Sequence, residues 1–245
     1  MIERDIVIPM SDGSSDAVLF RPDGNNPLPG VLHLTDIGGI RPSHREMARR
    51  LADKGFVVLM PNVFFRAGKP PMLDFAPKMG EERTMKRFGE LSAALQPAKM
   101  DTDGAAYADF LAAQDWVAKG KMGAVGYCFT GAMAMRTAAA RPDKIAAVAT
   151  FHGGGLYSAA PTSPHQVLPK IKAELFIGHA DKDQSMPAEA IQNLEAALKA
   201  WGGKYESEVF AAFHGWTVPD SPVYKKDEAD RAFDKMAALF ARTLR

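Results

Sequence analysis

The sequence predicts an α/β fold: a mostly parallel central sheet with helices on both faces, in a single domain spanning residues 1–245. Short apolar runs alternate along the chain with longer segments of helical periodicity. This alternation is typical of parallel strands joined by crossover helices. In addition, several apolar runs end in glycines and polar residues, and an open α/β sheet places its functional groups at such strand ends.

The chain opens with a predicted β-hairpin. Residues 3–8 and 16–21 alternate in polarity and are joined by the turn-forming sequence Met-Ser-Asp-Gly-Ser. The other apolar runs expected to be strands are 31–34, 56–60, 122–125, 145–151, 173–177 and 205–211. Helices are expected at 43–55, capped by Ser43 with Glu46, at 101–118, opened by Asp101 or Asp103, and at 131–140, 187–200 and 225–244.

Residues 62–100 follow neither pattern clearly. They mix prolines and aromatic side chains with arginines and lysines. A segment of this length between regular elements is either a lid or substrate loop, or a surface helix with its connectors.

Composition excludes several classes of function. The net charge of +1 offers no basic field for a nucleic acid or a membrane surface. No apolar stretch approaches the ~20 residues of a membrane span, and no basic segment followed by an apolar one marks a secretory signal. The single cysteine cannot form an internal disulfide, which suits a reducing compartment. We expect a cytoplasmic protein that binds neither nucleic acid nor membrane.

That cysteine, Cys128, lies between a strand and a helix. The sequence Gly126-Tyr127-Cys128-Phe129-Thr130-Gly131 follows an apolar run and precedes an Ala- and Met-rich helical segment. A nucleophile on such a sharp strand-to-helix turn is exposed above the sheet, with backbone N–H groups pointing towards it. Thr130 stands where glycine is usual, so the motif alone is a weak signal.

Other chemistry-bearing residues also follow predicted strands: Asp36, His152, Asp181, Asp183 and His214. Nucleophile, acid and histidine then occur in the chain order of an α/β-hydrolase. His214 can take the thiol proton and return it to a leaving group, while a carboxylate fixes its tautomer. Spacing alone leaves Asp181 and Asp183 both open as that acid. The backbone N–H groups of Phe129 and Ile37 are expected to form the oxyanion hole.

These motifs resemble those of the dienelactone hydrolase family of α/β-hydrolases. The sequence 126–131 resembles its cysteine elbow, 178–187 its acid loop and 213–216 its histidine loop, while 34–39 matches the loop that bears an oxyanion residue. The resemblance covers nearly the whole chain, and the proline in the acid loop selects Asp183. It implies hydrolysis of a small ester or lactone through a thioester on cysteine, without a metal or organic cofactor.

The chain also departs from that family. Its best-known members carry a glutamate that contacts the resting thiol and is displaced by substrate, and here the position is Asp36. Those members clamp a substrate carboxylate with arginines, for which only Arg83 and Arg87 are candidates here. These departures suggest a different substrate.

Four residues are expected to contact the substrate: Asp36, Tyr127, His152 and Trp216. Each has a plainer interpretation, as a turn cap for Asp36, a tight pocket wall for His152, and core packing for the two aromatic residues. The remaining histidines show no metal-ligand spacing, so no metal site is expected.

Two other functions compete with hydrolysis. One is a hydrolase-like module that binds a small molecule without turnover, and the other is oxidation of Cys128 by peroxide, for which the chain has no resolving cysteine. An ordered nucleophile, acid and histidine argue against the binding module. Either a monomer or a homodimer is compatible with the sequence.

Overall fold

The computed structural model describes residues 1–244 and contains one eight-stranded sheet in the order β1-β2-β4-β3-β5-β6-β7-β8. Strands β3 to β8 are parallel, whereas β1 pairs antiparallel with β2, and β2 antiparallel with β4. The predicted mostly parallel sheet is therefore confirmed. The strands are β1 Ile2–Met10, β2 Gly13–Arg21, β3 Gly30–Leu34, β4 Val57–Pro61, β5 Met122–Tyr127, β6 Ile145–Phe151, β7 Glu174–Lys182 and β8 Tyr205–Phe213.

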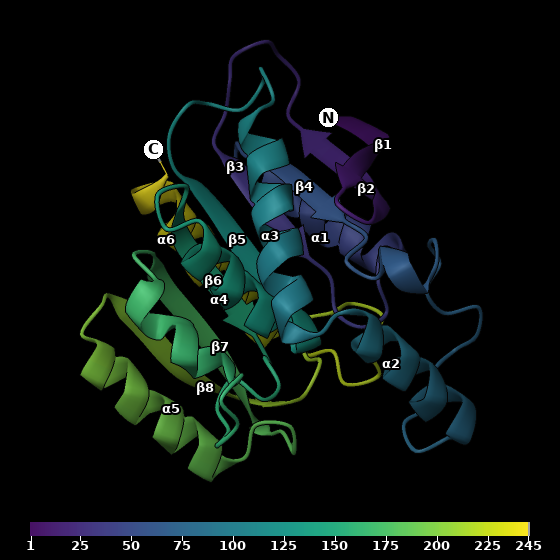
Figure 1. Cartoon of the computed structure of the whole chain (residues 1–245), viewed down its shortest axis with the longest axis vertical. Helices are drawn as coiled ribbons and strands as arrows, with labels where there is room; N and C mark the ends of the chain where they lie inside the picture. The colour runs from purple at the N-terminus through teal and green to yellow at the C-terminus, as the bar shows by residue number, and fades with distance from the viewer. Residues whose placement is uncertain (245) are drawn as a thin grey trace.

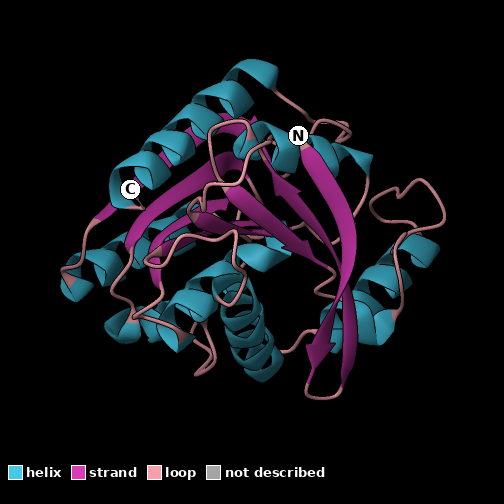
Figure 2. Cartoon of the chain, turned by 90° about the horizontal axis from the view of Figure 1, so that it is seen from above, coloured by secondary structure: helices cyan, strands magenta, loops and turns pink. Residues whose placement is uncertain are grey.

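Helices cover both faces of this sheet (Figures 1 and 2). In Figure 1, α3, α4 and α5 lie in front of the sheet and α6 lies behind it. The α-helices are α1 Pro42–Ala52, α2 Glu82–Ala94, α3 Pro97–Ala112, α4 Gly131–Ala140, α5 Ala188–Trp201 and α6 Lys226–Thr243, and the 3₁₀ turns are η1 Phe65–Ala67, η2 Cys128–Thr130 and η3 Pro164–Lys170.

The buried apolar side chains form two clusters. One includes Leu111 of α3 and Met133 of α4, and the other includes Leu51 of α1 and Phe240 of α6. The central strands β3, β4 and β5 are buried along their whole length. Their apolar residues on both faces are what the near-continuous hydrophobic runs in the sequence predicted.

Several element boundaries differ from the sequence prediction. Helix α1 begins at Pro42 after Arg41, without a side-chain cap, so Ser43 lies inside it. Helix α3 begins at Pro97 rather than at Asp101 or Asp103 and ends at Ala112. Proline suits the first turn of a helix because its missing N–H needs no partner there. Strand β7 continues to Lys182, because its pairing with β8 extends beyond the apolar run.

Residues 62–100 contain η1, all of α2 and the first turn of α3. In Figure 1, α2 projects from the body of the molecule at the lower right. Arg87 joins the parts of this segment, because its Nε donates to the Met72 carbonyl at 3.0 Å and its Nη2 to that of Ala67 at 3.4 Å. Within residues 1–244, no helix has both the length and the apolar character needed to cross a membrane.

Candidate active site

Cys128 is the first residue after β5 and has φ = +55°, in the left-handed region. The 3₁₀ turn η2 then leads directly into α4. A Cβ atom at position 126 would lie 2.3 Å from the Thr130 carbonyl oxygen, so this position requires glycine. The positive φ of a non-glycine residue is sterically costly and is often found at functional sites. These features are those of a nucleophile elbow.

Thr130 replaces the usual glycine without strain. Its φ of −84° is helical, so no left-handed conformation is needed there. Its buried hydroxyl donates to the Leu34 carbonyl at 2.8 Å and accepts the Tyr127 backbone N–H at 3.0 Å. Thr130 therefore connects the elbow to β3 and does not occupy the site.

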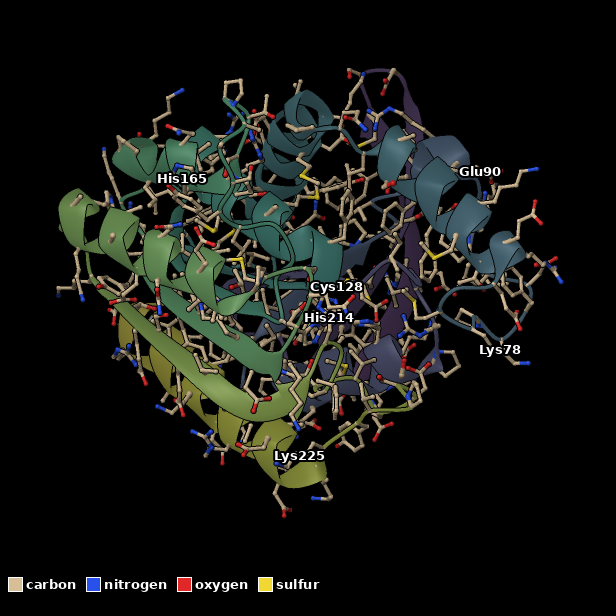
Figure 3. The ribbon with its side chains drawn as sticks, turned by 90° about the horizontal axis from the view of Figure 1, so that it is seen from below. Lys78, Glu90, Cys128, His165, His214 and Lys225 are labelled. Carbon is tan, nitrogen blue, oxygen red and sulfur yellow. The ribbon has the colours of Figure 1, made fainter. Side chains whose placement is uncertain are left out.

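His214 lies against the thiol and against one carboxylate. Its Nε2 is 3.0 Å from Cys128 Sγ, and its Nδ1 is 2.7 Å from Asp183 Oδ2. Figure 3 labels Cys128 and His214 side by side. After a register shift beyond Ala180, β7 and β8 end with Lys182 opposite Phe213, so the residues that follow, Asp183 and His214, are neighbours. Asp181 instead lies within β7 and is exposed.

Ser185 supports the carboxylate and was missed by the sequence analysis. Its backbone N–H donates to Asp183 Oδ1 at 2.8 Å, and its hydroxyl lies 2.5 Å from the same oxygen. A serine two residues after an aspartate is a common turn pattern, so the sequence offered only a weak signal.

The charges of this cluster are set by its hydrogen bonds. Burial acts to lower the pKa of His214, but the bonds to Asp183 and Cys128 outweigh it and raise that pKa to about 10. Burial acts to raise the pKa of Asp183, and the bonds from His214 and Ser185 leave it lowered. The Asp183 carboxylate is thus ionised and the imidazole carries a proton at neutral pH.

His152 lies beside His214 rather than on an open surface. Its ring is 1% exposed, stands edge-on to the His214 ring at 5.1 Å, and places Nε2 2.7 Å from the Thr217 hydroxyl. Burial, followed by the nearby charge of His214, lowers its pKa to about 3. A neutral His152 therefore packs against the His214 ring.

Tyr127 and Trp216, expected to contact substrate, are instead buried in the core. Trp216 stacks on Phe210 with ring centroids 4.4 Å apart, and Tyr127 packs against Phe151 at 5.6 Å. Tyr127 is the last residue of β5, where successive side chains point to opposite faces, so it points away from the side of Cys128. Trp216 lies in the turn after β8, two residues beyond His214. This corrects the substrate-contact expectation in favour of the core interpretation.

Asp36 does not pair with the thiol, which contacts His214. Its Oδ1 accepts the Gly38 backbone N–H at 2.9 Å and an Arg41 N–H at 2.5 Å, and its Oδ2 accepts a second Arg41 N–H at 2.8 Å. His44 Nε2 lies 3.4 Å from that second oxygen. These contacts hold the turn that contains Ile37, so Asp36 shapes the loop after β3.

Apolar residues of the 62–100 segment reach this loop and the elbow. The Phe64 ring stacks on that of Phe129 at 6.4 Å. The Met72 side chain packs so closely on Gly39 that a Cβ there would lie 2.4 Å from Met72 Cγ. The side of the site next to Phe129 is therefore apolar.

The two arginines considered for a substrate clamp have partners within that segment. Arg83 pairs with Asp74 at 2.9 Å, and Arg87 pairs with Glu90 at 2.9 Å besides its two carbonyl contacts. Among residues 1–244, no group of three or more His, Cys, Asp or Glu side chains is arranged to hold a metal ion.

Comparisons with known proteins point to one family. The model of the dienelactone hydrolase family matches residues 15–244. A carboxymethylenebutenolidase of Rhodococcus opacus is 28% identical over 202 residues, covering 78% of this chain and 73% of the relative. A candidate carboxymethylenebutenolidase of Methylorubrum extorquens is 25% identical over 248 residues, covering 98% of this chain and 81% of the relative.

A solved structure shares the fold over the whole chain. A candidate dienelactone hydrolase from Klebsiella pneumoniae subsp. pneumoniae MGH 78578 aligns with a TM-score of 0.86 at 24% identity, covering 98% of each chain. The family match spans nearly all of the described residues. The chain therefore belongs to the dienelactone hydrolase family and is a hydrolase with the α/β-hydrolase fold.

Proposed function

We propose that this hydrolase cleaves a small carboxylic ester or lactone through a thioester on Cys128, with His214 as proton carrier and Asp183 as the acid that orients it. The observation that carries the proposal is the continuous contact from Sγ through the imidazole to the carboxylate, 3.0 Å and 2.7 Å. The carboxymethylenebutenolidase name of the relatives supports an ester or lactone as substrate.

At rest the imidazole of His214 is protonated and lies next to the sulfur that must attack as a thiolate. The raised pKa of His214 keeps this proton on the ring at neutral pH, where a leaving group can take it. Because Asp36 is bonded to Arg41 and Gly38, the thiol has no carboxylate to leave before reaction. The triad is therefore assembled before substrate binds.

In the first half-reaction, the thiolate attacks the carbonyl carbon and a C–S bond forms. The oxyanion accepts hydrogen bonds from the backbone N–H groups of Phe129 and Ile37. The C–O bond to the alcohol breaks, and the departing oxygen takes the proton from His214 Nε2. The products of this step are a thioester on Cys128 and a neutral imidazole.

In the second half-reaction, water attacks the thioester carbonyl while His214 Nε2 takes its proton. The tetrahedral intermediate collapses, the C–S bond breaks, and the thiolate returns beside the imidazolium. The acid product leaves as its carboxylate, giving its proton to solvent. Asp183 stays ionised throughout and stabilises the charged imidazole.

The test compares wild type with Cys128→Ala on p-nitrophenyl acetate and on a dienelactone. We expect the variant to lose at least about a thousandfold in kcat/KM, because the nucleophile is removed. Unchanged turnover in Cys128→Ala would contradict the proposal. Tight binding of either compound by wild type without any turnover would favour the binding module instead.

A further inference from the structure

Arg41 has no hydrogen-bond donor left for a ligand. A guanidinium carries five N–H donors. Two of these N–H groups bond Asp36 at 2.5 and 2.8 Å, two bond Asp220 at 2.8 and 3.0 Å, and one bonds the Gly39 carbonyl at 3.3 Å. A guanidinium binds a carboxylate through two parallel N–H donors. In Arg41 both such pairs of donors are already bonded to carboxylates of the protein itself, those of Asp36 and Asp220.

This arginine lies between the two loops that flank the thiol. Asp36 belongs to the loop after β3 that contains Ile37, and Asp220 belongs to the loop after His214. The Arg41 side chain is 22% exposed and that of Asp220 is 47% exposed, so solvent reaches the outer edge of the pair. A substrate carboxylate could bond Arg41 at this outer edge only by displacing the carboxylate of Asp220.

The cluster is also negatively charged. One guanidinium faces two carboxylates, and Arg41 lowers the pKa of Asp220 despite the burial that acts to raise it. Both acids therefore remain ionised at neutral pH. The net negative charge of this cluster would repel an anionic substrate and so disfavour its binding.

The arginines of the 62–100 segment are also paired with acidic side chains. Arg66 is paired with Asp12 and Asp103, and Arg83 with Asp74. Arg87 is bonded to Glu90 and two backbone carbonyls. The contact from this segment to the elbow is instead the apolar stack of Phe64 on Phe129.

We propose, resting on the hydrolase function above, that the substrate is an uncharged ester or lactone with an apolar group next to Phe129. In this proposal Asp220 is a specificity-determining residue, because it occupies the donors of Arg41 and thereby excludes substrates that bear a carboxylate.

The first experiment compares two substrates that differ only in charge: mono-p-nitrophenyl adipate and its methyl ester. They share the acyl chain and the leaving group. We expect wild type to prefer the methyl ester by about tenfold or more in kcat/KM, because Arg41 has no free donor for the acid and the two aspartates repel its charge. Equal or better turnover of the acid would overturn the proposal.

The second experiment changes the proposed determinant. Asp220→Asn keeps the side-chain size but removes the charge and one of the two oxygens that accept from Arg41, so it leaves one Arg41 N–H available to a ligand. We expect the preference ratio to shift towards the acid by about tenfold. Asp227→Asn is the matched control, because Asp227 is exposed on α6 and its loss changes the net charge equally. A shift of the same size in the control, or no shift in Asp220→Asn, would contradict the role of Asp220.

A third measurement separates this inference from the triad. Cys128→Ala, with and without Asp220→Asn, is titrated with monomethyl adipate and dimethyl adipate, which requires no turnover. We expect the diester to bind more tightly than the acid, and Asp220→Asn to reverse or remove that difference. If wild type turned over neither p-nitrophenyl ester, the proposed function would fail, and this titration would still decide the charge preference of the site.

Discussion

Two aspartates at the same edge of the sheet have different partners and therefore different roles. Asp183 accepts bonds from Ser185 and faces the imidazole of His214. Asp36 faces the guanidinium of Arg41, a group that stays protonated. The ring beside Asp183 also contacts Cys128 Sγ, so this carboxylate can tune proton transfer there, whereas the contacts of Asp36 to Arg41, Gly38 and His44 hold a turn. Partner chemistry, rather than residue type, separates the two.

Replacing Asp183 should move the pH dependence of hydrolysis. The pKa of His214 is raised to about 10 from its ordinary value of 6.5, so the imidazolium needed for acylation is lost as pH rises through about 10. Asp183→Asn removes the main bond that raises this pKa. The alkaline limb of kcat/KM should therefore move to lower pH, together with a fall in its maximum of about 10²- to 10⁴-fold.

The matched control for this change is Asp181→Asn, two residues away on the exposed edge of β7. We expect its pH profile to match wild type. An alkaline limb that stayed in place in Asp183→Asn, or that moved equally in Asp181→Asn, would show that Asp183 does not set the protonation of His214.

The same shift also links pH to stability. A folded pKa above the unfolded value means that the imidazolium contributes stability fully below about pH 6.5. This contribution is lost as pH rises through about 10. Urea unfolding of wild type and His214→Gln should thus differ more at pH 6 than near pH 10, and a difference that grew with pH would contradict this sign.

At the scale of elements, the elbow depends on how closely β5 and α4 approach. A Cβ on residue 126 would lie 2.3 Å from the Thr130 carbonyl oxygen, a backbone atom that cannot move without shifting the turn. Gly126→Ala should therefore cost about 1–3 kcal/mol of unfolding free energy and also reduce kcat.

Gly89 provides the contrast. It lies in α2, where a Cβ would meet nothing within 4 Å. Gly89→Ala should stabilise the protein by about 0.5–1 kcal/mol, because alanine loses less backbone entropy in a helix. Urea unfolding of both variants measures these opposite effects. Equal changes in unfolding free energy for the two substitutions would mean that the close approach at residue 126 does not determine which residue this position accepts.

The Thr130 hydroxyl should matter for the same junction. Thr130→Val removes the acceptor of the buried Tyr127 N–H and the donor to Leu34, which should cost about 1–3 kcal/mol. Thr130→Ser keeps the hydroxyl and should cost clearly less. Thermal or urea unfolding of this pair checks the interpretation, and a loss in Thr130→Val no larger than that in Thr130→Ser would show that the hydroxyl does not stabilise this junction.

At the scale of the whole molecule, the sequence predicted the fold and the candidate catalytic residues better than it predicted the contacts that hold those residues in place. Cys128 and His214 could be found because each directly follows an apolar strand, and strand ends meet at one edge of a parallel sheet. The choice between Asp181 and Asp183 was ambiguous from the residues, because the end of β7 depends on its pairing with β8.

The contacts that support the site were beyond local patterns. Arg41 and Asp220 are 179 residues apart, and no periodicity joins them. The burial of Tyr127, at the end of β5, and of Trp216, in the turn after β8, depends on tertiary packing against Phe151 and Phe210. A helix with connectors was one of two interpretations of residues 62–100, and the structure contains α2 there together with η1 and connecting loops.

The most direct test of the account is to observe the acyl group on the protein. Wild type is mixed with p-nitrophenyl acetate, quenched in acid within a single turnover, and analysed by intact-mass and peptide mass spectrometry. We expect one added acetyl group, on the peptide that contains Cys128, which disappears as acetate is released and is absent in Cys128→Ala. Hydrolysis that proceeds with no acyl group on Cys128, or with an acyl group on another residue, would contradict it.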